Sequence, residues 1–204
     1  MQVPDVAILH TSRFPREVFA DFERLVASPR LQLAFDEREE DGPYASVEWL
    51  IPTAVIAYIG KSYFDGFLKE AGKDHYAVLK SGLKSLYSKL VGPEAPKVTV
   101  VSTQGKTKDP QIYSLVFSLL AEAGPKARIK LLIRNGASSA EYEDTIRTFL
   151  EFVSAHHEGT LDPHVLQAVD GVRVVGETLL VAYNPSTGQI EPVDPSPRPP
   201  ASAA

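Results

Sequence analysis

The chain has 204 residues, of which 44% are hydrophobic and 23% are charged, so it is long and apolar enough to form one globular domain with its own core. It contains no cysteine, which excludes disulfides, thiolate metal sites and a cysteine nucleophile. The net charge is −5, yet residues 61–134 hold thirteen of the 21 basic residues and only six of the 26 acidic ones. This basic segment either pairs with acidic segments of the same fold or forms a face for an anionic partner.

The first forty residues predict a β-α-β unit. A short apolar run at 5–10 is typical of a buried strand. Residues 15–26 place apolar side chains at helical spacing after Pro15, a residue that suits the first turn of a helix. Alternating apolar and polar residues over 31–39 then indicate a half-buried strand.

Residues 49–60 carry no charge and form the most apolar stretch of the chain. As a helix this run would span about 18 Å, against about 30 Å for the hydrocarbon core of a bilayer, so it is too short to cross a membrane. Because a proline deep inside a helix costs about 3 kcal/mol, Pro52 favours a helix that begins near this residue. We therefore predict a helix from about residue 52, buried within the protein.

The segment 73–91 predicts an amphipathic helix with an apolar face and several lysines off that face. Gly92 and Pro93 follow it and favour its termination there. Together with the apolar helix before it, this segment forms a predicted helical hairpin over about 52–91. One arm of the hairpin is apolar and the other is basic.

The second half of the chain predicts strands, one long helix and a hairpin. Apolar runs indicate strands over 97–103, 112–123 and 127–135. Residues 138–157 predict a helix with Ser138 or Ser139 as its N-cap. Turn residues at 184–188 between two apolar runs predict a C-terminal β-hairpin.

These elements predict the α+β fold class. We expect a single domain over 1–194 with a mixed sheet, the opening β-α-β unit, the central helical hairpin and the C-terminal β-hairpin. The tail at 195–204 is rich in proline, alanine and serine and is expected to be disordered.

Lysines form the main candidate binding residues. Lys80, Lys84 and Lys89 lie off the apolar face of the basic arm, and Lys106 and Lys108 lie in a polar connection at 102–110. Their ammonium groups suit an anionic partner or an acidic surface. The connection lacks the spacing of a phosphate-binding loop, and the chain shows no nucleic-acid-binding signature.

His10, Asp74 and His75 form the candidate polar site. His10 ends the first predicted strand, while Asp74 and His75 begin the basic helix, and such groups can act as acids or bases. Each also has a structural interpretation, because Asp74 can cap the helix and adjacent helical residues do not face each other.

Two further patterns are weak. Ser81 and Lys84 have the spacing of some serine acyl enzymes but lack the companion motifs. His156 and His157 lie near His164 and Asp162, but consecutive residues at a helix end point in different directions, so we predict no metal site. No catalytic residue and no cofactor is assigned.

The first functional hypothesis is a non-enzymatic interaction protein that uses the 52–91 hairpin to bind a protein partner or to self-associate. The N-terminal residues lack the pattern of a signal peptide, so we expect a cytoplasmic protein. One alternative is a membrane-active or peripherally docked protein whose hairpin lies on an anionic membrane surface. A second alternative is an enzyme with a dispersed polar site near His10 and His75.

Overall fold

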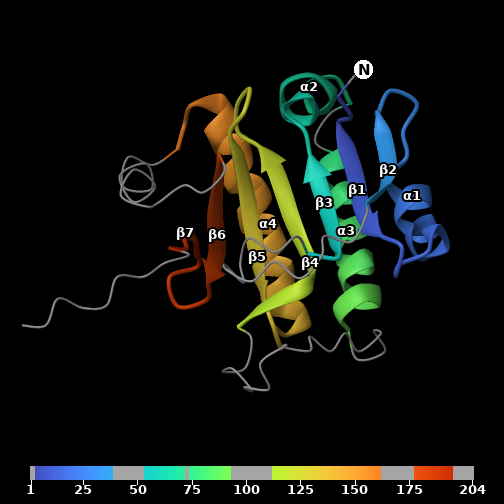
Figure 1. The fold of residues 1–204 in the computed structure, drawn as a ribbon. Helices are drawn as coiled ribbons and strands as arrows, with labels where there is room; N and C mark the ends of the chain where they lie inside the picture. Colours follow the sequence, from blue (N-terminus) through green and yellow to red (C-terminus); the bar gives the residue numbers. More distant parts are fainter. Residues whose placement is uncertain (1–2, 39–52, 72–73, 93–111, 162–176, 195–204) are drawn as a thin grey trace, which may run out of the picture.

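Seven strands form one mixed sheet in the order β2-β1-β3-β4-β5-β6-β7, and the long helices α3 and α4 lie together on one face of it (Figure 1). The computed structural model describes residues 3–38, 53–71, 74–92, 112–161 and 177–194. The strands are β1 (Val6–Thr11), β2 (Leu33–Arg38), β3 (Val55–Ile59), β4 (Tyr113–Glu122), β5 (Arg128–Arg134), β6 (Thr178–Asn184) and β7 (Gln189–Pro192). The helices are η1 (Arg16–Phe19), α1 (Ala20–Val26), η2 (Tyr63–Phe67, a π-helical turn), α2 (Leu68–Ala71), α3 (Asp74–Val91) and α4 (Ser139–Glu158).

Three β-α-β units follow one another along the chain. In β1-α1-β2, β3-α3-β4 and β5-α4-β6, the two strands of each unit lie side by side and run parallel. Neighbouring units join through antiparallel pairs, β1 with β3 and β4 with β5, and β7 closes on β6 as a hairpin. The α+β class, the mixed sheet, the opening β-α-β unit and the C-terminal hairpin are thus confirmed.

The core lies between the helices and one face of the sheet. Alternate strand residues point into it, and those that are 1% exposed or less include Ile8, Ala57, Leu119, Leu131 and Val181. The helices cover them with buried side chains from α1, α3 and α4. This alternation follows from the two-residue period of a strand.

The opposite side of the sheet, here called the second face, is also largely buried. Five of its apolar residues lie outside the core cluster and are at most 7% exposed: Ala7, Ile56, Leu132, Leu180 and Ala182. The sequences of strands that are buried on both faces are continuously apolar and do not alternate between apolar and polar residues. This explains the sequence of β3, β5 and β6.

The predicted helical hairpin over 52–91 is wrong in its first arm. Val55–Ile59 is not helical but forms β3, which pairs with β1 on one side and β4 on the other. A short, fully buried strand has no period that separates it from a buried helix, and its β-branched residues favour the extended form. The strand ends at Gly60, where a Cβ would lie 2.7 Å from the carbonyl oxygen of Pro4.

The two long helices match their predicted ranges. α3 covers Asp74–Val91, and α4 begins after Ser138, whose Oγ accepts a hydrogen bond from the Glu141 amide at 3.1 Å. α4 ends at Gly159, which has the left-handed φ of 69° that glycine tolerates. The predicted strand over 97–103 and the predicted tail over 195–204 lie outside the described residues. Within the described ranges, every helix is too short or too polar to cross a bilayer.

Gly82 sets how closely α3 approaches α1. A Cβ there would lie 2.6 Å from Cγ2 of Val26 and 3.2 Å from Cδ2 of Phe22. We predict that Gly82→Ala lowers the free energy of unfolding by about 1–3 kcal/mol, because overpacking outweighs the gain of about 1 kcal/mol in helix propensity. Urea unfolding measures the change. Gly66→Ala is the control, since its Cβ would meet no atom within 4 Å; equal stability of the two variants would contradict the close crossing.

Candidate functional site

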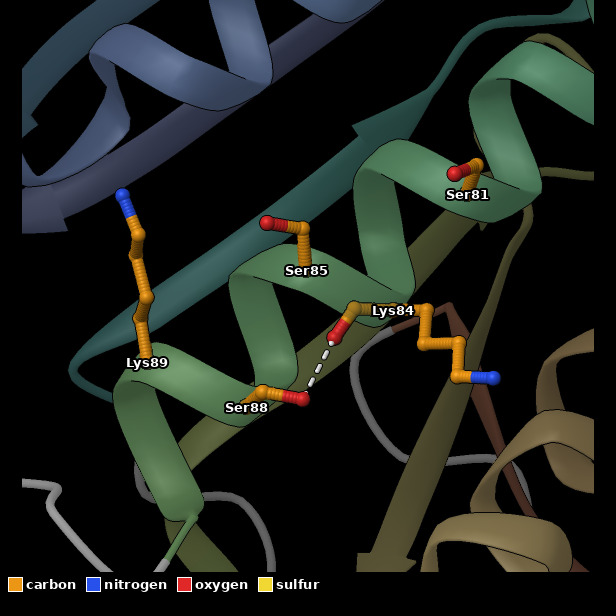
Figure 2. Close-up of a pocket in the computed structure, with 5 residues that line it drawn as sticks. All are labelled: Ser81, Lys84, Ser85, Ser88 and Lys89. Atoms are coloured by element: carbon orange, nitrogen blue, oxygen red, sulfur yellow. Dashed lines mark hydrogen bonds between the residues drawn. The ribbon is translucent and has the colours of Figure 1, made fainter.

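An open groove of about 730 Å³ runs along the outer side of α3 (Figure 2). It is lined by Ser81, Lys84, Ser85, Ser88 and Lys89. Their spacing of three and four residues keeps most of them on one side of the helix. Figure 2 shows Lys89 reaching toward α1 and Lys84 reaching the other way, toward α4. We call this feature the α3 groove.

Each lysine of the α3 groove makes an ion pair with a flanking helix. Lys84 Nζ donates to Oε2 of Glu143 on α4 at 2.6 Å, and Lys89 pairs with Asp21 on α1. The hydrogen bond from Lys89 is the main cause that lowers the pKa of Asp21, and the bond from Lys84 does the same for Glu143. The two pairs therefore join α3 to both of its neighbours.

Positive charge is in excess around the α3 groove. Arg24 also donates to Asp21, at 2.7 Å, and Lys80 lies close enough to Glu143 to lower the pKa of that carboxyl group. Asp144 lies close enough to Glu143 to raise the same pKa, so among the described residues these four cations lie beside three carboxylates: Asp21, Glu143 and Asp144. These groove cations are Arg24, Lys80, Lys84 and Lys89.

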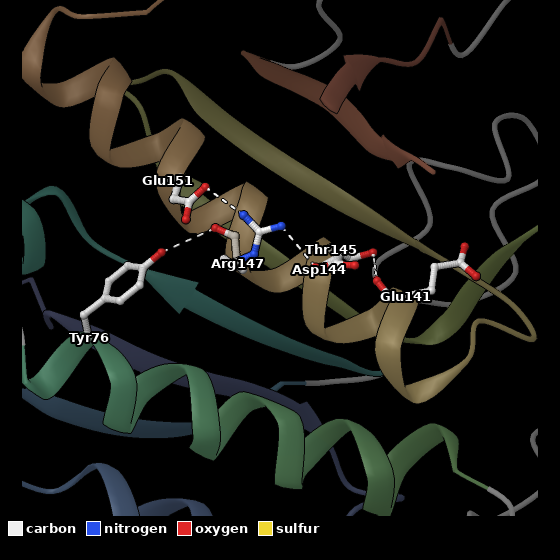
Figure 3. Close-up of polar contacts among 6 residues, drawn as sticks. All are labelled: Tyr76, Glu141, Asp144, Thr145, Arg147 and Glu151. Carbon is white, nitrogen blue, oxygen red and sulfur yellow. Dashed lines mark hydrogen bonds and ion pairs between the residues drawn. The ribbon is translucent and has the colours of Figure 1, made fainter. Parts of the chain in front are cut away.

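Arg147, on α4, does not add to the positive charge around the α3 groove. Arg147 pairs with Asp144 at 3.1 Å and with Glu151 at 3.3 Å, both on its own helix (Figure 3). Its carbonyl oxygen accepts a hydrogen bond from the Tyr76 hydroxyl of α3 at 3.4 Å. This contact helps fix the position of α4 beside α3.

The serine hydroxyls of the α3 groove differ in their partners. Ser88 Oγ donates to the carbonyl oxygen of Lys84 at 3.1 Å, as Figure 2 shows. Within the described ranges, the hydroxyls of Ser81 and Ser85 make no hydrogen bond. They are therefore available to a ligand in the α3 groove, alongside the two ammonium groups.

The structure brings three of the five predicted lysines together. Lys84 and Lys89 line the α3 groove, and Lys80 lies one helical turn before Lys84. Lys106 and Lys108 lie outside the described residues.

The three residues of the predicted polar site have separate surroundings. His10 is 3% exposed, and its ring lies 4.7 Å from that of Phe19. His75 donates from Nε2 to the carbonyl oxygen of Val26 at 2.9 Å, and its Nδ1 accepts from the Tyr63 hydroxyl at 3.2 Å. Asp74 is exposed at the start of α3. Among the described residues, no hydrogen bond or ring contact joins His10 to His75.

His156 and His157 also have different surroundings. His156 Nε2 donates to the carbonyl oxygen of Ala123 at 2.9 Å, whereas the ring of His157 lies 5.4 Å from that of Phe64. Burial is the main cause that lowers the pKa of His157. In the part of the chain that the structure describes, no three His, Asp or Glu side chains gather as metal ligands would.

A second polar cluster crosses the second face, and the sequence analysis missed it. Five neighbouring segments contribute one side chain each, from β2, β1, the residues before β3, β4 and β5. These residues, here called the polar row, are Arg38, Thr11, Thr53, Ser118 and Lys130.

Hydrogen bonds and charge link four members of the polar row: Arg38, Thr53, Ser118 and Lys130. Arg38 Nη2 donates to the carbonyl oxygen of Thr53 at 2.7 Å, and the Thr53 hydroxyl is hydrogen-bonded to that of Ser118. Lys130 is 7% exposed. Burial, and secondarily the charge of Arg38, lowers the pKa of Lys130 to about 8. Lys130, a charged residue within the apolar run of β5, was the sequence signal for this cluster. The neighbours of Lys130 on other strands are known only from the register of the sheet.

No protein-family model matches the chain, and no similar curated protein or solved structure is found. Any assignment of function therefore rests on the chemistry of its own side chains. Two features offer such chemistry: the α3 groove and the polar row.

Removing the charge of Lys130 should change how stability depends on pH. The folded pKa of about 8 lies below the unfolded value of about 10.4, so the unfolded state binds more protons between these values. Stability of the unaltered protein should therefore rise by about 2 kcal/mol from pH 8 to pH 10 relative to Lys130→Met. Urea unfolding across this range measures the difference.

The control for this experiment is Lys126→Met, which removes an exposed lysine near the start of the same strand. Its stability should follow that of the unaltered protein at every pH. Parallel pH profiles for the unaltered protein and Lys130→Met would contradict the buried position of Lys130.

Proposed function

We propose that the protein is a non-enzymatic binding protein that holds an acidic segment of a partner protein in the α3 groove. One observation carries this proposal: four cations around the groove lie beside three carboxylates. The excess charge is local, because the whole chain carries a net charge of −5. A local positive patch favours a short acidic segment over the long backbone of a nucleic acid.

The ion pairs of the α3 groove are readily exchanged for a partner's carboxylates. The side chains of Lys84 and Glu143 are 43% and 44% exposed, and those of Lys89 and Asp21 are 41% and 38% exposed. Pairs this exposed contribute little to stability, because water screens their charges. An incoming carboxylate therefore displaces them at a small cost in free energy.

The shape of the α3 groove suits a chain segment better than a single small ion. The lining residues extend from Ser81 to Lys89, which corresponds to about 12 Å along the helix axis. The two lysine side chains point in different directions, Lys89 toward α1 and Lys84 toward α4. The hydroxyls of Ser81 and Ser85 supply further donors to carboxylate oxygens between them.

The basic arm of the predicted hairpin, and not the apolar arm, carries this proposal. Phe64 and Phe67, which belong to the apolar arm, are 5% and 7% exposed and pack in the core cluster. They are not available to a partner or to a lipid surface unless the core opens. The proposed setting is the cytoplasm, which suits a chain without cysteine.

A labelled poly-glutamate peptide tests the proposal by fluorescence anisotropy. It should bind the unaltered protein, and binding should weaken as salt is raised from low to physiological concentration. Combined Lys80→Glu, Lys84→Glu and Lys89→Glu should weaken binding at least about tenfold, equal to about 1.4 kcal/mol. Lys84→Gln with Lys89→Gln removes two of these positive charges without adding carboxylates beside Asp21 and Glu143, and should also weaken binding.

The matched control replaces three exposed lysines outside the α3 groove with glutamate: Lys61, Lys69 and Lys126. It changes the net charge by the same amount, so its affinity should fall much less than that of the groove variant. An equal loss in both variants would show that only overall charge matters. Binding of phosphatidylserine vesicles by the unaltered protein, with no binding of the peptide, would favour the membrane-docked alternative instead.

A further inference from the structure

We propose that His157 and Phe64 form a pH-sensitive latch, which holds the π-helical turn η2 against the end of α4. The latch is closed while the imidazole of His157 is neutral, and it opens when this ring gains a proton. Neither residue lines the α3 groove, so the proposal does not depend on the function assigned to that groove.

The latch joins two elements that are far apart in the chain. Phe64 lies in η2 and His157 lies near the end of α4, with their ring centroids 5.4 Å apart and their planes 30° from parallel. Phe64 is 5% exposed and belongs to the core cluster. A stacked ring contact of this kind stabilises the packing of η2 on α4.

The Nε2 atom of His157 is suited to a neutral ring only. It is buried and makes no hydrogen bond among the described residues. The ring has a backbone hydrogen bond with Glu122, and because a carbonyl oxygen only accepts, this bond places the proton of the neutral ring on Nδ1. A second proton on Nε2 would be a buried donor without an acceptor, on a ring that carries a charge.

The acidic side chains beside the latch already have partners. Glu122 Oε2 accepts a hydrogen bond from the Tyr58 hydroxyl at 3.2 Å and another from the Lys61 amide at 3.0 Å. Asp65, which lies in η2, pairs with Lys61 Nζ at 3.5 Å. Neither carboxylate is hydrogen-bonded to Nε2 of His157 in the part of the chain that the structure describes.

Charged groups act on His157 from α4, from the end of β4 and from the segment around η2. Burial has the largest effect and lowers the pKa of His157. The backbone hydrogen bond with Glu122 and the carboxylate of Asp65 favour the charged ring and raise this pKa. The positive charges of His156 and Lys61 lower it. The balance favours the neutral ring in the closed latch.

The lowered pKa of His157 gives the latch a definite pH dependence. The unfolded pKa is about 6.5, so an open latch binds more protons than a closed one between the folded pKa and this value. The stability that the latch contributes is therefore present above about pH 6.5 and is lost as the pH falls through the folded pKa. Opening uncovers Phe64 and Phe67, which are 5% and 7% exposed in the closed form.

Hydrogen exchange of the Leu68 amide tests the latch, because this amide donates the π-helical hydrogen bond to the carbonyl oxygen of Tyr63. Its protection factor corrects for the pH dependence of intrinsic exchange. From about pH 7.5 to about pH 5, we expect this factor to fall at least about threefold in the unaltered protein. In His157→Phe, which keeps a ring beside Phe64 but gains no proton, the factor should be equal at both pH values.

His156→Gln is the matched control, because the ring of His156 also lies at the end of α4 but its Nε2 already donates to the carbonyl oxygen of Ala123 at 2.9 Å. This variant should keep most of the pH response of Leu68. An NMR titration of the His157 ring in the unaltered protein supplies a second readout. Its midpoint should lie below that of the urea-unfolded chain.

The proposal is overturned if the protection of Leu68 does not change with pH, or if the change persists in His157→Phe. It is also overturned if His156→Gln abolishes the change. A titration midpoint of His157 at or above that of the unfolded chain would overturn it too, because the attraction of an imidazolium to the face of Phe64 would then outweigh the cost of burial.

Discussion

The pairing of β3 with both β1 and β4 is the constraint on which the rest of the structure depends. β3 is antiparallel to β1 and parallel to β4, and it is the strand that joins the first β-α-β unit to the others. Val55, Ala57 and Ile59 are all 0% exposed and belong to the core cluster. The placement of both groups of cations depends on β3. Thr53 of the polar row lies just before β3 in the chain, and α3, which carries the groove, follows β3.

The two sites hold their cations in opposite ways. In the α3 groove, Lys84 and Lys89 are about two-fifths exposed and face carboxylates that water also solvates, so their charges cost little and are easily exchanged. In the polar row, Lys130 is withdrawn from water beside Arg38, so its charge is costly and depends on what lies near it. The exposed cations of α3 and the buried Lys130 thus lie in different environments on the two sides of one sheet.

Much of the fold was predictable from local signals, whereas the sites depend on contacts between distant residues. The N-cap at Ser138 and the glycine at 159 set the limits of α4, and the turn at 184–188 set the β6–β7 hairpin. β3 was not predictable, because a strand buried on both faces carries no alternation. The lysines off the apolar face of α3 were predictable, but their partners Asp21 and Glu143 are 68 and 59 residues away along the chain. The polar row requires the register of five neighbouring segments, which no single stretch of sequence contains.

Cross-strand disulfide formation tests the position of β3 most directly, and a chain without cysteine suits it well. Ala7 and Tyr58 are register partners in the antiparallel pair of β1 and β3, where opposing Cα atoms lie about 4.5–5.5 Å apart, within reach of a disulfide. Ala7→Cys with Tyr58→Cys should therefore form the disulfide readily under mild oxidation of the folded protein. Ala7→Cys with Ala57→Cys, whose side chains point to opposite faces, should not. A helix over 55–59 would contradict the account, and its signature would be failure of the first pair or equal oxidation of both.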